Sequence, residues 1–206
     1  MTHGVPYMLG DFGVTFEAED WDLHLLGLRG IAHNVRIARD SKAAPVLTAT
    51  EVEFNATLGS IVGRLIGRPQ TFDQIIIRDA DVRLEQSLTG DWNWSQFIDT
   101  VPAERKQAVA RGQYQTRGLT LDRVRIEYLE HIPGNSGGGV IQTAQARVYA
   151  DDVSGEVRNL IAPGTHGDLP TTFELKGRSS DGIVQIVGRG AFFAFADQPG
   201  SAIPVD

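Results

Sequence analysis

Four carboxylates near the middle of the chain are the first candidates for chemistry. Asp79, Asp81, Glu85 and Asp91 lie within the run "DADVRLEQSLTGD", and a pair of carboxylates is what glycoside hydrolysis requires. In an extended strand successive side chains point to opposite faces, so Asp79, Asp81 and Glu85 fall on the face opposite the apolar residues of the same run. A solvated, charged strand face explains these carboxylates without catalysis.

The other reactive residue types form no catalytic or cofactor motif. The five histidines are scattered and none has the spacing of a metal motif. The glycine-rich "GNSGGG" at 134–139 is not followed by the Lys-Ser or Lys-Thr of a phosphate-binding loop. Cysteine is absent, which excludes disulfides, thiolate metal sites and a cysteine nucleophile. We therefore expect a protein that is not an enzyme and that holds neither a cofactor nor a metal ion.

Length, composition and charge limit the domain organisation and the kind of partner that we expect. With 206 residues, 41% of them hydrophobic, the chain can bury a core, and we expect one domain over 1–196 and a flexible tail over 197–206. Its net charge of −7 repels the phosphate backbone, so a nucleic-acid partner is not expected. No apolar run approaches the ~20 residues that cross a bilayer, and the N-terminus does not have the layout of a signal peptide.

Hydrophobic periodicity predicts a mainly β fold. In "VLTATEVEFNAT" at 46–57 the even-numbered residues, including Val52 and Phe54, fall on one face, and the odd-numbered ones, including Leu47 and Ala49, fall on the other. Similar alternation predicts at least eight strands separated by turns, which favours an antiparallel sheet. A second example is the set Ile31, His33, Val35 and Ile37.

Two segments interrupt this pattern. "LGSIVGRLIG" at 58–67 has apolar residues at helical spacing but also three glycines, which indicates a short helix or a loose turn. At about 94–112 a helical insert is predicted, with Pro102 in a first turn and Gly112 as a stop signal.

Long strands with one apolar face must cover that face with a second sheet, a closed barrel, a helix or an apolar ligand. Because few helices are predicted, we expect a curved, taco-like or half-open barrel sheet whose interior is shared with lipid-like material. The candidate groove residues are Val52, Phe54, Val82, Leu84, Val124, Ile126 and Tyr128. The alternative is that these side chains pack into an ordinary closed core, and the pattern alone does not separate the two.

The stretch "TGDWNWSQF" at 89–97 follows the run "ADVRLEQS" and indicates a strand end whose tryptophans cap the edge of the core. From here the order of segments resembles the AsmA-like family of bacterial cell-envelope proteins. The matching parts are "IIIRDADVRLEQ", a Gly-x-x-Asn-Trp motif at Gly90, Asn93 and Trp94, "LTLDRVRIEYLE", "AQARVYADD" and "TTFELKGRSSDGIVQIVGRG". The resemblance covers roughly residues 46 to 190.

The resemblance implies a periplasmic protein with an apolar concave face that handles phospholipids and helps to maintain the outer membrane. Its anchor in the inner membrane would be an N-terminal helix that this sequence does not include. Two other functions remain open: a scaffold or accessory subunit that docks onto a membrane-protein complex, and an enzyme, for which no catalytic motif is found.

Overall fold

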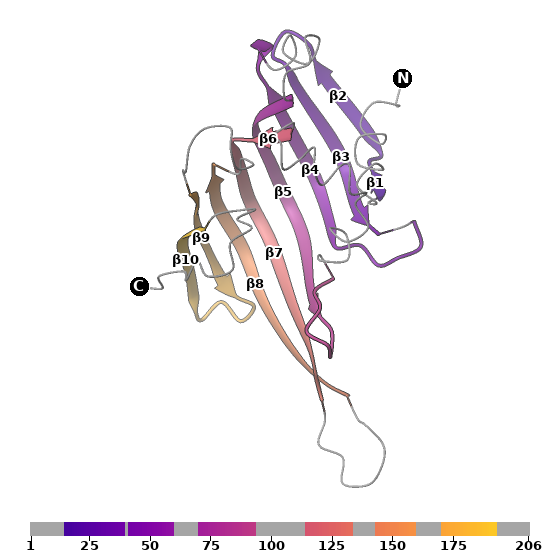
Figure 1. Ribbon diagram of the computed structural model, residues 1–206, viewed down its shortest axis with the longest axis vertical. Coiled ribbons are helices and arrows are strands. Elements are labelled where there is room, and N and C mark those ends of the chain that lie inside the picture. The colour runs from indigo at the N-terminus through magenta and orange to yellow at the C-terminus, as the bar shows by residue number, and fades with distance from the viewer. Residues whose placement is uncertain are drawn as a thin grey trace.

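The computed structural model describes residues 15–39, 41–59, 70–93, 114–133, 143–159 and 170–192. These residues form ten strands in one sheet, which Figure 1 shows as a set of long, bending ribbons. The strands are β1 (Thr15–Glu17), β2 (Asp20–His24), β3 (Arg29–Ala38), β4 (Leu47–Ala56), β5 (Gln70–Gln86), β6 (Tyr114–Thr116), β7 (Gly118–Pro133), β8 (Thr143–Arg158), β9 (Thr171–Ser179) and β10 (Gln185–Phe192).

The order of strands across the sheet is β1-β3-β4-β5-β7-β8-β9-β10, with β2 beside β3 and β6 beside β5. The two ends of this series do not pair with each other, so the sheet is not closed into a barrel. A mainly β fold built on a curved, open sheet is thus confirmed. The predicted helical insert at 94–112, the tail at 197–206 and most of the predicted helix at 58–67 lie outside the described residues.

The sheet differs from the antiparallel prediction at one central joint. β5 and β7 run parallel, from Ile75 beside Leu119 to Gln86 beside Glu130, and β6 also runs parallel to β5. A parallel pair needs a crossover of about a dozen residues or more to bring the chain back to the same end of the sheet. Residues 94–113 supply that length between the two strands.

One face of the sheet carries a continuous apolar core that extends from β1 to β8. Its most central row consists of directly paired residues, one from each successive strand, each at most 5% exposed. The row is Val35, Ala49, Ala80, Val124 and Val153. A second row, Ala32, Val52, Ile77, Leu121, Gly155 and Leu175, runs parallel to the first on the same face.

The strict alternation predicted for β3 and β4 is wrong. Between the two rows, successive core residues of one strand are three positions apart instead of two. On β4, Leu47 and Ala49 lie in the same core as Val52 and Phe54, although alternation would place the two pairs on opposite faces. The same spacing of i, i+2, i+5 and i+7 recurs on β5, where Ile75 and Ile77 are followed by Ala80 and Val82. On β7 the core residues Leu121, Val124 and Ile126 include the same step of three. On β3 the core residues are Ala32, Val35 and Ile37, and His33 is not among them.

Each step is made by two consecutive polar residues, and together they form a line across the sheet that we call the polar crease. The crease consists of His33–Asn34, Thr50–Glu51, Arg78–Asp79, Asp122–Arg123 and Asp151–Asp152. On β8 the polar pair lies slightly out of line, and the register shifts there relative to both neighbouring strands.

Four crease residues have left-handed backbone angles inside strands. The φ values are 50° at Asn34, 48° at Asp79, 55° at Arg123 and 52° at Asp152. This conformation costs an ordinary residue ~1–2 kcal/mol, and Asn and Asp tolerate it best. Three of the four positions are therefore filled by the residue types that the backbone favours, and Arg123 is the exception.

We expect Asn34→Ala to be less stable than Asn34→Gly by about 1 kcal/mol. Both variants lose the hydrogen bond that Asn34 donates to Glu19 (2.6 Å), so the difference between them isolates the left-handed backbone. Urea unfolding of the two variants measures it. Equal stability would mean that the crease conformation carries no strain.

Candidate functional site

The seven predicted groove residues lie on the apolar face, but their exposure divides them. Val52 (4% exposed) and Val124 (0%) are part of the core. Phe54, Val82 and Ile126 are half-buried and pack against it. A ligand would reach Val52 or Val124 only by displacing the atoms that now cover them. The other two residues, Leu84 and Tyr128, are half-buried and lie outside that cluster.

Leu84 and Tyr128 belong to a more open end of the same face. They are neighbours in register on β5 and β7, and Tyr128 lies directly opposite Val148 on β8. Val148 is 57% exposed, and the ring of Trp92 (39% exposed) lies 5.7 Å from that of Tyr128. We call Leu84, Trp92, Tyr128 and Val148 the open apolar end. Sequence reasoning did not single out Trp92 or Val148 individually, although Val148 follows the alternation of its strand.

An aromatic row crosses the apolar face of the sheet from β1 to β5. The rings of Phe16, Trp21, Phe54 and Phe72 follow one another at centroid distances of 5.8, 6.2 and 6.0 Å. Rings at this spacing stabilise each other beyond the area that they bury. The row therefore fixes Phe54, one of the predicted groove residues, in a packed rather than a mobile position.

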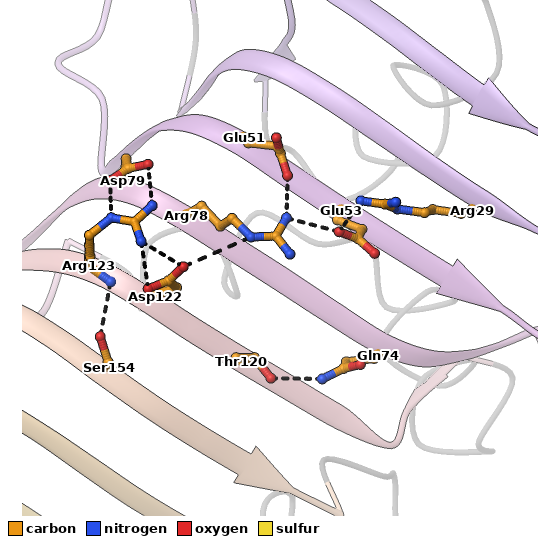
Figure 2. Close-up of polar contacts among 10 residues, drawn as sticks. All are labelled: Arg29, Glu51, Glu53, Gln74, Arg78, Asp79, Thr120, Asp122, Arg123 and Ser154. Atoms are coloured by element: carbon orange, nitrogen blue, oxygen red, sulfur yellow. Dashed lines mark hydrogen bonds and ion pairs between the residues drawn. The ribbon is translucent and has the colours of Figure 1, made fainter.

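The opposite face carries the charged side chains, and Figure 2 shows the group around the crease. Arg78 on β5 donates hydrogen bonds to Glu51 and Glu53 on β4 and lies 4.0 Å from Asp122 on β7. Arg29 on β3 donates to the same Glu53 oxygen at 2.7 Å. These ion pairs connect four adjacent strands at the level of the crease.

Glu53 is the buried member of this group, with a side chain only 7% exposed. Burial alone would raise the pKa of Glu53, but hydrogen bonds from Asn55, Arg78 and Arg29 together outweigh it, so the net effect is a lowered pKa. The carboxylate is therefore charged and held by three donors, and these contacts leave it poorly suited to act as a general acid or base.

Asp79 and Arg123, which are adjacent crease residues, form a two-point contact. Arg123 Nε and Nη2 donate to the two carboxylate oxygens of Asp79 at 2.7 and 2.8 Å, and the Arg123 backbone N–H donates to Ser154 Oγ at 3.1 Å. The hydrogen bonds from Arg123 lower the pKa of Asp79.

Glu85, another of the central carboxylates, is also paired. Glu85 lies 2.9 Å from His131 and 3.1 Å from Arg83. A hollow of about 380 Å³ is bordered by Arg125 and Arg147, which pair with Asp151 (3.3 Å) and Glu127 (3.1 Å) respectively. The charged face is thus occupied by internal ion pairs.

The Gly-x-x-Asn motif serves the end of β5. Gly90 has a φ of 87° in the turn after the strand, a conformation that glycine adopts without strain. Asn93 takes the place of a neighbouring strand beyond Val82, where β5 extends past Leu47, the first residue of β4. Its backbone N–H donates to Glu85 O (2.8 Å), its side-chain Oδ1 accepts from Glu85 N (3.0 Å), and its Nδ2 donates to Arg83 O (2.8 Å). Trp94 lies outside the described residues.

Among the residues that the structure describes, no three His, Cys, Asp or Glu side chains are grouped as a metal site. The described part of the chain also contains no helix that is long and apolar enough to span a bilayer. No protein-family model matches the chain, and no curated protein matches it. What the AsmA-like resemblance implies therefore stays a prediction.

We expect Asn93→Ala to lower the free energy of unfolding by about 1–3 kcal/mol, because it leaves half-buried backbone groups of β5 without partners. Asn93→Asp keeps the Oδ1 acceptor but loses the donor to Arg83 O, so its loss should be smaller. Urea unfolding measures both. Wild-type stability in Asn93→Ala would show that Asn93 does not hold the end of the strand.

The lowered pKa values of Glu53 and Asp79 predict loss of stability in acid. A carboxyl whose pKa is lower in the folded state stabilises the fold above its unfolded pKa, and this contribution is lost as pH falls through the folded pKa. We expect the free energy of unfolding to fall below about pH 4.5, the ordinary pKa of Glu53.

Glu53→Gln should lower the free energy of unfolding by about 1.5–3 kcal/mol at neutral pH, because the charge-assisted hydrogen bonds are weakened. On acidification the free energy of unfolding of this variant should fall less than that of the wild type. Urea unfolding between neutral pH and about pH 3 tests both points. If the free energy of unfolding of Glu53→Gln falls with pH as steeply as that of the wild type, Glu53 is not a cause of the loss of stability in acid.

Proposed function

We propose that this protein is a non-enzymatic carrier that binds the acyl part of a phospholipid on the apolar face of its sheet. The observation that carries the proposal is the division of the sheet into one apolar and one ion-paired face, with the apolar face uncovered at the open apolar end. Acyl chains need an apolar surface and no reactive group, whereas catalysis needs reactive groups that are free to react.

The energetics favour such a surface for lipid. Each methylene that leaves a bilayer for water costs ~0.8 kcal/mol, so a sixteen-carbon chain costs about 13 kcal/mol. Covering even part of the chain with Leu84, Trp92, Tyr128 and Val148 would recover part of this cost. The buried centre of the core makes the open apolar end, rather than Val52 or Val124, the first point of contact.

The resemblance to AsmA-like proteins supports the same proposal and also implies a cellular location. In that case the protein works in the periplasm, tethered to the inner membrane, and passes phospholipid between membranes. The acidic net charge of −7 also makes a nucleic-acid partner unfavourable.

A second candidate function is a subunit that docks onto a membrane-protein complex. It is favoured by the β9–β10 hairpin, where Ile183 (81% exposed), Val184 (55%) and Val187 (58%) present apolar side chains to solvent. Exposed apolar residues gathered at a sheet edge are typical of contact surfaces. Lipid binding and docking use different parts of the sheet, so they can be tested separately.

We expect Val148→Asp to weaken binding of a fluorescent long-chain phospholipid at least tenfold, because a carboxylate on the open apolar end would have to be desolvated. Fluorescence titration measures the Kd, and native mass spectrometry measures the stoichiometry. Val187→Asp is the matched control. Val187 is equally exposed, at 58% against 57%, and it pairs with Lys176 on the charged side of β9.

The control should bind lipid as the wild type does. Equal losses in both variants would show non-specific adsorption. If the folded wild type does not bind, the carrier proposal is wrong and docking through the β9–β10 hairpin becomes the function to pursue.

A further inference from the structure

The polar crease combines two properties that a rigid strand segment does not need. Left-handed residues interrupt four strands at one level, namely Asn34, Asp79, Arg123 and Asp152. The pairing of β8 with both neighbours is irregular at the same level. Strained backbone of this kind persists only when surrounding contacts hold it, and it is common where a protein has two arrangements.

The contacts that hold the crease run along it rather than across it. Arg78 connects β4 to β7 through Glu51 and Asp122, the Asp79–Arg123 pair connects β5 to β7, and Arg178 on β9 donates to Asp152 on β8. Such contacts fix the conformation of the crease residues. They do little to prevent the parts of the sheet above and below the crease from changing their mutual angle.

Arg123 is the residue on which this arrangement depends. It is the crease residue least suited to a φ of 55°. Its side chain is held by the two-point contact with Asp79 on the neighbouring strand and by Asp122 on its own strand, to which Nη1 donates at 3.1 Å. The Asp79–Arg123 pair is exposed, with side chains 46% and 54% accessible respectively, and exposed ion pairs are weak and screened by salt. A weak contact therefore holds a strained backbone.

We propose that the polar crease is a hinge and that the Asp79–Arg123 ion pair holds it in the bent position. When the pair is broken, the left-handed backbone at Arg123 opens to a less bent conformation, while Val124 and Ile126 stay on the apolar face. The angle between the two parts of the apolar face changes with it. This proposal concerns the shape of the protein alone and does not depend on whether lipid binds.

The test is a distance measurement along β7 by electron–electron double resonance. Because the chain contains no cysteine, Arg117→Cys and Ile132→Cys create the only two labelling sites. Both positions are exposed and they lie on opposite sides of Asp122–Arg123. A straight strand would separate their α-carbons by about 50 Å.

In the labelled protein at low salt we expect one short, narrow distance. Asp79→Asn should lengthen the mean distance by at least about 3 Å, one residue's rise, because asparagine tolerates the backbone angle but lacks the charge. Arg123→Val should lengthen it further, since valine disfavours a positive φ. Arg123→Gly should keep the mean distance of the doubly labelled protein without further substitution, the parent, because glycine adopts the bent conformation without the Asp79–Arg123 ion pair. High salt should shift the parent toward the longer distance.

Glu156→Gln is the control, because it removes an ion pair with Arg158 (2.6 Å) away from the crease. Its distance should match that of the parent. The hinge is excluded if salt and Asp79→Asn leave the mean and the width unchanged, or if Glu156→Gln lengthens the distance as much as Asp79→Asn does. Should Arg123→Val fail to fold, Asp79→Asn and the salt series still decide.

Discussion

The constraint on which this fold depends is that β3, β4, β5 and β7 must change face at the same level, with β8 changing face close by. If β5 alone kept strict alternation, Ala80 and Val82 would turn to the charged side while Ala49 and Val124 beside them stayed in the core. Because side chains alternate along a strand, the change of face requires two consecutive polar residues. The polar crease supplies them on β3, β4, β5, β7 and β8.

This constraint also explains the chemistry of the charged face. Two polar residues on each of several adjacent strands bring many charges close together, and they are arranged as alternating pairs such as Glu51, Arg78 and Asp122. Hydrogen bonds within this network lower the pKa values of Glu53 and Asp79. Shifted pKa values often indicate an active site, but here a structural requirement accounts for them.

The sequence predicted the β class from local alternation and the curved, open sheet from the scarcity of helices to cover an apolar face. It also predicted the common face of Val82, Val124 and Ile126. It did not predict the step on β4 or the parallel joint between β5 and β7. The spacing i, i+2, i+5, i+7 was present in the letters, but a search for a period of two does not detect it. The parallel joint depends on a long-range return of the chain, which no local pattern encodes.

The parallel joint also has a consequence for the order of folding. β3 with β4, β7 with β8 and β9 with β10 are partners that follow one another along the chain, whereas β5 must wait for β7 to arrive after residues 94–113. Contacts between distant segments form slowly, since the entropy of closing the loop opposes them. During synthesis β5 therefore has an unpaired edge until the second half of the sheet emerges, and in that interval the chain is most exposed to aggregation.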